Sequence, residues 1–288
     1  MYKRQVKSFD KRDYRILVGI EVAMKFFEWV PVTEISKYAN LPSSEVTYRL
    51  KLLGKSDLLQ HTIHPYDGYR IYFNGYDVLA LYTLVARGTL AALGSIMGVG
   101  KESVVYEAQD SFGHSVVVKM HREGRTSFKQ VKRSRTHLDG VRHFSWIYAA
   151  RLAAKTEYDF LVQLYPKVSV PRPIDQNRNS IVMEVAKGWP LVSVKLENPI
   201  WYFDEIVREI KNAYNLGFIH GDLSEFNVFA HDDGVTLIDW PQCLSVGSEG
   251  SDEVLMRDIV NVTRFFKRKY GLELDAEKTY QSVTDPIE

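Results

Sequence analysis

The stretch that indicates the fold is Ile219-His220-Gly221-Asp222-Leu223-Ser224-Glu225-Phe226-Asn227, in which Asp222 and Asn227 stand five residues apart. The residues after it predict a β-hairpin, because β-branched and aromatic side chains flank the turn sequence Asp233-Gly234. The second strand of this hairpin leads to Asp239. We therefore expect Asn227 and Asp239, at the two ends of one hairpin, to lie close together.

These three side chains predict phosphoryl-transfer chemistry. Asn227 and Asp239 supply the oxygen ligands that a hard, octahedral Mg²⁺ ion prefers when it bridges phosphates. The spacing from Asp222 to Asn227 is that of kinase catalytic loops, in which the Asp orients the attacking hydroxyl and the Asn holds a metal ion. The alternative is a plain acidic turn followed by an Asp at a strand end. Segments upstream favour the first interpretation.

The first of these segments matches a nucleotide-binding loop. It consists of Gly98, Val99, Gly100, Lys101, Glu102 and Ser103. The run keeps the first two glycines of a Gly-x-Gly-x-x-Gly loop, which let main-chain amides approach phosphate oxygens, and Ser103 replaces the third. A glycine pair between two strands can also be an ordinary turn, so this run carries weight only with its neighbours.

Two further segments follow in kinase order. A β-branched strand ends in Lys119, an arrangement that presents an ammonium group to nucleotide phosphates. Because an unpaired buried lysine is costly, we expect Glu157, on a predicted helix, to be its partner. Such a pair is also a common structural contact. The predicted hinge, whose backbone would meet adenine, is formed by Met183, Glu184 and Val185.

The N-terminal quarter predicts a winged helix. Helices are expected over residues 10–30, from Thr33 to Tyr38, and from Ser43 or Ser44 to Gly54. A hairpin over residues 58–64 and 69–73, turning at Asp67-Gly68, and a helix over residues 76–86 follow. The third helix would present Thr47, Arg49 and Lys51 outward. Because the charge of this face is weak, nucleic-acid contact of some kind is favoured and sequence-specific recognition of DNA is not. A module of the same topology that docks on a protein remains an alternative.

Composition narrows the class of protein. With 288 residues, of which 45% are hydrophobic, the chain is not intrinsically disordered and favours two domains. The single cysteine allows no internal disulfide, and no apolar block opens the sequence, so we expect a cytoplasmic protein. Arg87 and several glycines interrupt the most apolar stretch, residues 78–100, which argues against a membrane span.

The net charge of +1 hides two oppositely charged regions. Basic residues concentrate between Lys119 and Arg135, whereas acidic residues cluster over residues 222–258. A basic arm over residues 122–143 would give salt-dependent affinity for RNA, and the acidic region suits a metal site. The small sum is therefore a cancellation and is not evidence against an RNA partner.

Together these motifs resemble the RIO kinase family, and specifically its second type, which carries an N-terminal winged helix. The resemblance rests on residues 98–103, on Gly124–Phe128 in the basic arm, on residues 220–227 and on Ile238-Asp239-Trp240-Pro241-Gln242. It covers essentially the whole chain. Trp240 and Val104 depart from the residues that are common in the family, but neither change removes a ligand.

The resemblance implies an atypical serine/threonine protein kinase and ATPase that uses ATP with Mg²⁺ or Mn²⁺. It implies that Asp222 is the catalytic aspartate, that Asn227 and Asp239 bind the metal ion, and that Lys119 contacts the phosphates. Asp239 could also accept the γ-phosphate as an aspartyl-phosphate. A role in maturation of the small ribosomal subunit follows, with precursor ribosomal RNA and proteins as partners.

The expected fold class is α+β. A winged helix over residues 1–84 would precede a two-lobed, truncated kinase domain over residues 85–288, with its N-lobe at about 91–183 and its C-lobe at about 187–288. Only 49 residues follow Asp239, without an Ala-Pro-Glu segment, so no platform for an extended peptide is expected. Autophosphorylation or ATP turnover on a large assembly is favoured.

Two other functions remain open at this point. A small-molecule kinase of the aminoglycoside or choline type shares the His-Gly-Asp and Ile-Asp-Trp loops, and transfer to an amino alcohol would support it. A winged-helix regulator that only senses nucleotide would bind nucleic acid without hydrolysing ATP. The oligomeric state is not predicted.

Overall fold

A computed structural model describes residues 9–122 and 146–285 of the chain. The chain divides into two compact units, one of residues 1–155 with 174–182 and one of residues 156–173 with 183–288. The predicted boundary near residue 84 falls inside the first unit and remains a prediction. Residues 123–143 of the expected basic arm lie outside the described residues. No helix that the structure describes is long and apolar enough to cross a bilayer.

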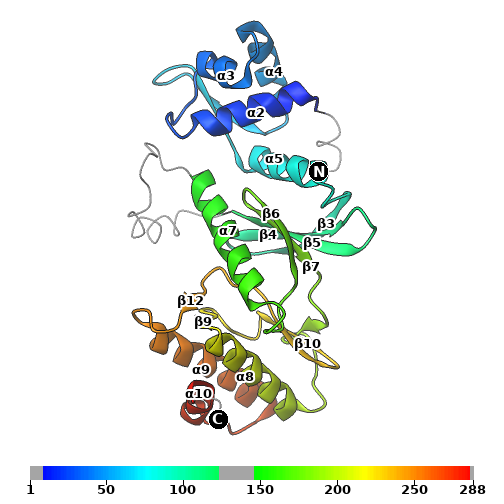
Figure 1. The fold of residues 1–288 in the computed structure, drawn as a ribbon, viewed down its shortest axis with the longest axis vertical. Coiled ribbons are helices and arrows are strands. Elements are labelled where there is room, and N and C mark those ends of the chain that lie inside the picture. The colour runs from blue at the N-terminus through cyan, green and yellow to red at the C-terminus, as the bar shows by residue number, and fades with distance from the viewer. Residues whose placement is uncertain (1–8, 123–145, 286–288) are drawn as a thin grey trace. The chain divides into compact units, whose positions relative to one another are not determined.

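The first unit begins with the predicted winged helix (Figure 1). Its elements are α2 (Lys11–Ala23), α3 (Val32–Ala39), α4 (Ser43–Lys55), β1 (Leu59–Thr62), β2 (Gly68–Ile71) and α5 (Phe73–Ala86). The first helix is shorter than the expected span of 10–30. It ends at Ala23, and Val30, at the end of the expected span, forms two main-chain hydrogen bonds with Tyr69 and so belongs to the edge of the wing.

Three local predictions in this region are wrong. Thr33 and Ser43 or Ser44 are the residues at which the two helices were expected to begin and which were expected to cap them, but the N-caps are Pro31 and Pro42, whose backbone is extended. Helix α4 runs through Gly54, which has open space around it, to Lys55. The wing turns over residues 63–67, and Gly68 already belongs to β2, where a Cβ would lie 2.8 Å from the Cβ of Trp29.

Arg49 is the most consequential correction. Sequence spacing placed it outward on α4, but it is only 8% exposed. Its guanidinium donates to Asp13 at 2.7 Å, to Asp10 at 2.8 Å and to Glu45 at 2.6 Å. Three carboxylates compensate the buried cation, so Arg49 joins the start of α2 to α4 and does not contribute to the outer surface.

The rest of the first unit contains a five-stranded sheet with the order β3-β4-β5-β7-β6. Its strands are β3 (Ala92–Val99), β4 (Ser103–Gln109), β5 (Ser115–His121), β6 (Pro173–Asn177) and β7 (Ser180–Glu184). Apolar side chains of α2, α4, α5 and the sheet form one continuous core. Helix α7 (Trp146–Leu164) begins in this unit and ends in the second.

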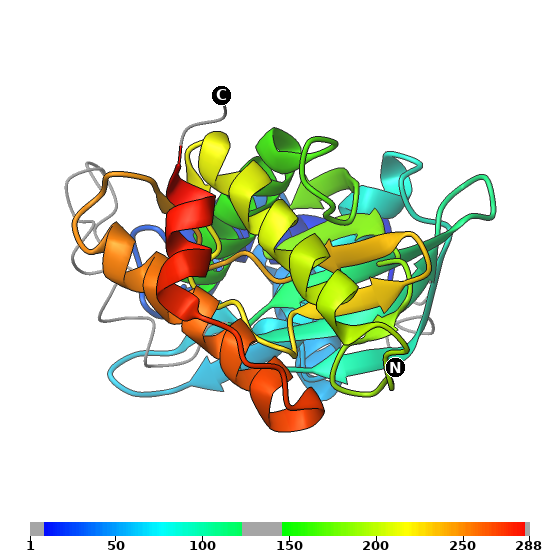
Figure 2. The ribbon, with the colours of Figure 1, turned by 90° about the horizontal axis from the view of Figure 1, so that it is seen from below.

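The second unit consists mainly of helices with short strands between them. Its elements are β8 (Trp189–Pro190), α8 (Pro199–Asn215), β9 (Phe218–Ile219), β10 (Val228–His231), β11 (Gly234–Leu237), β12 (Leu244–Ser245), α9 (Ser251–Tyr270) and α10 (Ala276–Thr284). The three helices pack together, as Figure 2 shows in yellow, orange and red. β10 and β11 form the predicted hairpin, but its turn is Asp232-Asp233 and not Asp233-Gly234, because Gly234 already pairs with His231 as the first residue of β11. β9 delivers the stretch that begins at His220.

Candidate active site

The predicted catalytic loop runs from His220 to Asn227 and lies between β9 and β10. Gly221 has a φ of 85°, and a Cβ at this residue would lie 2.2 Å from the carbonyl oxygen of Gln242. Only glycine fits both constraints without a shift of the backbone. Asp222 follows with its side chain exposed, while Leu223 is fully buried and fixes the loop to the core of the second unit.

The structure brings Asp222, Asn227 and Asp239 together within the second unit. The Nδ2 of Asn227 donates to the main-chain oxygen of Asp222 at 2.8 Å. The amide of Ile238 donates to the main-chain oxygen of Asn227 at 2.9 Å, so the two hairpin ends meet next to Asp239. Asp239 has a φ of 68°, a left-handed conformation that is uncommon for a residue with a Cβ and is concentrated at functional sites.

The donor set at these positions fits Mg²⁺. Because Asn227 uses its Nδ2 to hold the loop, its Oδ1 is the atom left to act as a ligand. Asp239 adds carboxylate oxygens, and Mg²⁺ commonly takes one or two protein ligands with phosphates and water completing its octahedron. Within residues 9–122 and 146–285, no cluster of three or more His, Cys, Asp or Glu side chains forms a dedicated metal cage.

His220 orients the backbone of the loop. Its Nε2 lies 3.0 Å from the main-chain oxygen of Ile238, and its Nδ1 accepts from the amide of Asp222 at 3.3 Å. These two contacts are satisfied by the neutral ring that carries its proton on Nε2. The ring also lies against the buried indole of Trp240, 4.4 Å between centroids. Cys243 is buried, and burial raises its pKa to about 12, so it is no nucleophile.

Helix α9 holds the loop by its main-chain groups, which the sequence did not predict. Asp258 accepts from the amide of Gly221 at 2.8 Å and from that of Leu223 at 3.1 Å. These are the two residues on either side of Asp222. Arg257 donates to the carbonyl oxygen of Gly221, and Asn261 donates to that of Leu223 at 3.2 Å. One face of α9 therefore sets the backbone on which Asp222 stands.

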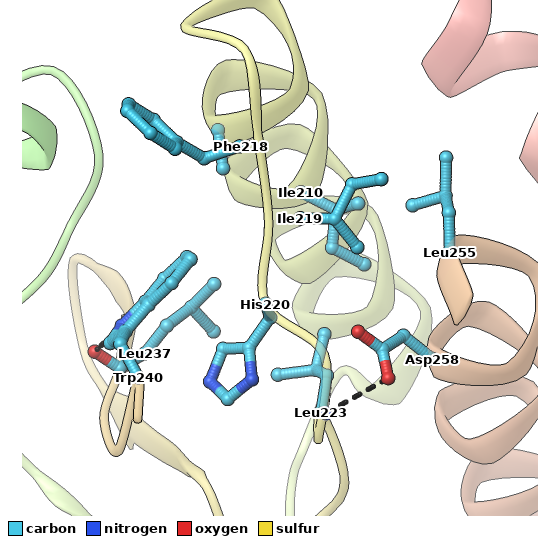
Figure 3. Close-up of a pocket in the computed structure, with 10 residues that line it drawn as sticks. Ile210, Phe218, Ile219, His220, Leu223, Leu237, Trp240, Leu255 and Asp258 are labelled. Carbon is cyan, nitrogen blue, oxygen red and sulfur yellow. Dashed lines mark hydrogen bonds between the residues drawn. The ribbon is translucent and has the colours of Figure 1, made fainter. Parts of the chain in front are cut away.

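Asp258 lies in mainly apolar surroundings, which Figure 3 shows beside the loop. A small cavity there is lined by Leu223, Leu255 and Trp240 among other apolar side chains, and Asp258 is its one carboxylate. Burial raises the pKa of Asp258 to about 6, although the amide hydrogen bonds from Gly221 and Leu223 act to lower it.

The signal for Asp258 was present in the sequence. It stands on the face of α9 that also carries Leu255, Ile259 and Val262, all buried. A carboxylate at a core position of an amphipathic helix is costly unless main-chain or charged groups bond to it. An isolated Asp on an apolar helical stripe therefore indicates a buried polar contact, but its partner comes from a distant segment.

Glu157 also bonds within the second unit. It is 1% exposed, and its Oε1 accepts from the amide of Trp240 at 3.1 Å. This contact fixes the residue directly after Asp239. The pairing of Glu157 with Lys119, which stands 5% exposed on β5 in the first unit, remains a prediction.

The predicted nucleotide loop joins β3 to β4 in the first unit. Gly98, Val99, Gly100, Lys101 and Glu102 are exposed, and Ser103 begins β4. The Gly100 amide donates to the Ser103 oxygen at 2.8 Å, and β3 has register shifts on both sides of Ile96. In the predicted hinge, Met183 is buried, while Glu184 and Val185 are exposed. Arg172 pairs with Glu184 at 2.8 Å.

Comparison with known families agrees with the motif order. Residues 104–279 match the RIO domain family, and residues 6–87 match the family described as Rio2, N-terminal. The chain belongs to the RIO kinase family. Its N-terminal match places it with the second type, so the resemblance stated from the sequence and the predicted fold class are both confirmed.

Individual relatives support this assignment. The kinase is 39% identical over 272 residues to the RIO-type serine/threonine-protein kinase Rio2 of Methanocaldococcus jannaschii, covering 91% of this chain and 100% of the relative. It is 36% identical to the serine/threonine-protein kinase RIO2 of Saccharomyces cerevisiae, covering 91% of this chain and 64% of the yeast protein. The Chaetomium thermophilum Rio2 kinase–ADP/Mg²⁺–phosphoaspartate complex superposes with a TM-score of 0.83 at 32% identity, covering 98% of this chain and 89% of that one.

Proposed function

We propose that this RIO kinase transfers the γ-phosphate of Mg-ATP to serine or threonine and also turns over ATP. The observation that carries the proposal is the meeting of Asp222, Asn227 and Asp239 through the bonds at 2.8 Å and 2.9 Å that close the loop and the hairpin. The structure of the Chaetomium relative, a complex with ADP and Mg²⁺, supports the same ligands for this chain.

In this proposal the predicted site residues have separate parts in the chemistry. Main-chain amides of residues 98–103 and the ammonium group of Lys119 bind phosphate oxygens. Met183, Glu184 and Val185 contact the adenine. Asn227 and Asp239 hold Mg²⁺, which neutralises the charge that develops on the phosphates. Asp222 accepts a hydrogen bond from the attacking hydroxyl and so orients it toward phosphorus.

Asp239 has a second role in the ATPase cycle. One of its carboxylate oxygens attacks the γ-phosphorus, the bond from phosphorus to the β–γ bridging oxygen breaks, and ADP leaves with that electron pair. Water then attacks the resulting acyl phosphate and releases inorganic phosphate, which restores the carboxylate. The phosphoaspartate in the Chaetomium Rio2 kinase complex supports this step.

The partners we propose are precursor RNA and proteins of the small ribosomal subunit, in the cytoplasm. Family membership supports them, together with the basic composition of residues 122–143. Arg122 itself is paired with Asp77, so the RNA-binding charge would come from the other basic residues of that segment.

Radiolabelled phosphate transfer from ATP tests the catalytic assignment. Asp222→Asn should lower autophosphorylation and ATP turnover by a factor on the order of 10² or more, because it removes a preorganised charge from the site. Asp233→Asn, in the exposed hairpin turn, is the matched control and should retain activity. Wild-type activity in Asp222→Asn would refute the proposal.

The same assay separates the two phosphate acceptors. Hydroxylamine cleaves an acyl phosphate but not a phosphoserine, so label on Asp239 should be lost on treatment and absent in Asp239→Asn. Label that resists hydroxylamine throughout the time course would refute the aspartyl-phosphate.

A further inference from the structure

Arg122 stands where β5 leaves the sheet, and its backbone touches the nucleotide loop. The β4–β5 ladder pairs Ser103 with His121. One residue further, the amide of Arg122 donates to the carbonyl oxygen of Glu102 at 2.7 Å. Glu102 lies inside the loop of residues 98–103, so this bond extends the ladder into the loop.

The side chain of Arg122 is anchored on the winged helix. Its Nη2 pairs with the carboxylate of Asp77, a residue of α5 that is 0% exposed. Asn179, in the turn between β6 and β7, donates its Nδ2 to the other oxygen of Asp77 at 2.7 Å. The guanidinium also lies over the ring of Phe73, 5.8 Å from its centroid.

The backbone next to Arg122 is held as well. The amide of His121 donates to the main-chain oxygen of Asn179 at 2.7 Å, and Asn179 donates its Nδ2 to the His121 oxygen at 3.0 Å. Moving Arg122 away would remove a cation from the buried Asp77 carboxylate, which is energetically unfavourable. The position of the Glu102 carbonyl is therefore tied to α5.

We propose that Arg122 is a positioning residue for nucleotide binding, through which the winged helix sets the conformation of the loop. The inference rests on the proposed role of residues 98–103 in binding phosphate. It has a reciprocal consequence, because a partner that shifts α5 must change the affinity for Mg-ATP by the same factor as Mg-ATP changes the affinity for that partner.

Four single variants of the full-length chain test this, with the affinity for a fluorescent Mg-ATP analogue as the readout. Asp77→Asn and Arg122→Ala should each weaken binding by about fivefold or more, a typical coupling between sites. Arg122→Lys keeps a cation for Asp77 and should retain most of the affinity. The matched control is Asp175→Asn, which breaks the Arg87–Asp175 pair at 2.9 Å, another contact of the α5 end with the sheet.

Amide hydrogen exchange separates a local change in the loop from a general loss of stability, because only the local change is confined to amides in and beside the loop. In Asp77→Asn the amides of Gly100 and Arg122 should exchange faster, while Asp175→Asn leaves them as in the wild type. The inference is overturned if Asp77→Asn and Arg122→Ala bind the analogue as tightly as wild type, or if Asp175→Asn weakens binding equally. Failure of the wild type to bind the analogue would instead refute the proposed function.

Discussion

The proposed catalytic loop (residues 220–227) and the proposed nucleotide loop (residues 98–103) of this kinase are held in different ways. In the catalytic loop, side chains of α9 bond to the main-chain groups of Gly221 and Leu223, and Leu223 is buried. The proposed nucleotide loop is exposed from Gly98 to Glu102. Gly98 and Val99 pair with β4, and main-chain bonds at Gly100 and Glu102 hold the rest. The contacts that hold the proposed catalytic loop thus come from side chains of another helix, whereas those that hold the proposed nucleotide loop come from main-chain groups of its neighbours.

This difference matches what each loop has to do. A group that orients a nucleophile contributes most when it needs no reorganisation during the reaction. A loop that encloses phosphates has to admit ATP and release ADP, so its contacts form with the ligand. Substitutions that affect the catalytic loop should therefore lower kcat, and those in the nucleotide loop should raise KM for ATP.

Among the variants that test this comparison, the largest effect is expected for Asp258→Asn. The amide side chain has nearly the same shape, but it has one acceptor oxygen where the carboxylate has two, so the Gly221 or the Leu223 amide loses its partner. A small misplacement of Asp222 should then lower kcat by about 10²-fold with KM for ATP little changed. Steady-state kinetics check this, with Asp252→Asn on the exposed first turn of α9 as control. An unchanged kcat would mean that the loop keeps its conformation without α9.

An intermediate effect is expected from pH. The pKa of Asp258 is about 6, raised from 3.8 by burial, and Arg257, Asp222 and the two loop amides face it. Between about pH 4 and 6 the folded state keeps a proton that the unfolded state has released, so this group's contribution to stability falls as pH rises. Over the same window the carboxylate ionises and accepts both amide bonds, so kcat should rise.

Wild type and Asp258→Asn should therefore differ in two opposite ways. The melting temperature of the wild type should fall relative to that of the variant as pH increases from about 4 to 6. Over the same range the wild-type kcat should increase near pH 6, while the kcat of the variant does not. Melting curves and pH–rate profiles of both proteins measure this. Identical profiles for the two proteins would show that Asp258 does not titrate in this range.

The smallest effect is expected for Lys101→Ala in the nucleotide loop. Lys101 is exposed, so its removal should leave the fold intact. Loss of one solvated cation near the phosphates should raise KM for ATP about two- to fivefold with kcat unchanged. Steady-state rates of ADP formation, measured over a range of ATP concentrations, give KM and kcat and so test this prediction. A fall in kcat at constant KM would place Lys101 at the reacting phosphate and would remove the contrast between the two loops.

Much of this organisation could be predicted from local sequence. The residues between Asn227 and Asp239 predicted a hairpin, and the structure closes its open end through the Ile238–Asn227 bond and the preceding loop through the Asn227–Asp222 bond. Alternation of helix and hairpin signals predicted the winged helix. These features depend on neighbours in the chain, which periodicity and turn chemistry describe well.

What could not be predicted depends on contacts between distant segments. Helical spacing predicted that Arg49 points outward, but it is buried because it donates hydrogen bonds to Asp10 and Asp13, more than thirty residues away in the chain. Asp258 and Asp77 are likewise buried carboxylates that accept hydrogen bonds from residues 35 or more positions away in the chain. Sequence pattern shows that such a charge needs a partner, but it does not name that partner.

The inward position of Arg49 also bears on the counterions of any bound nucleic acid. Each DNA phosphate that a protein cation neutralises releases condensed counterions. Each such contact increases the slope of the logarithm of the binding constant against the logarithm of the salt concentration by about 0.9 in magnitude. The charge of Arg49 is already matched by carboxylates of the protein, so α4 offers only Lys51 and Lys55 as exposed cations. A measured salt slope steeper than about two would thus report on charges elsewhere in the chain.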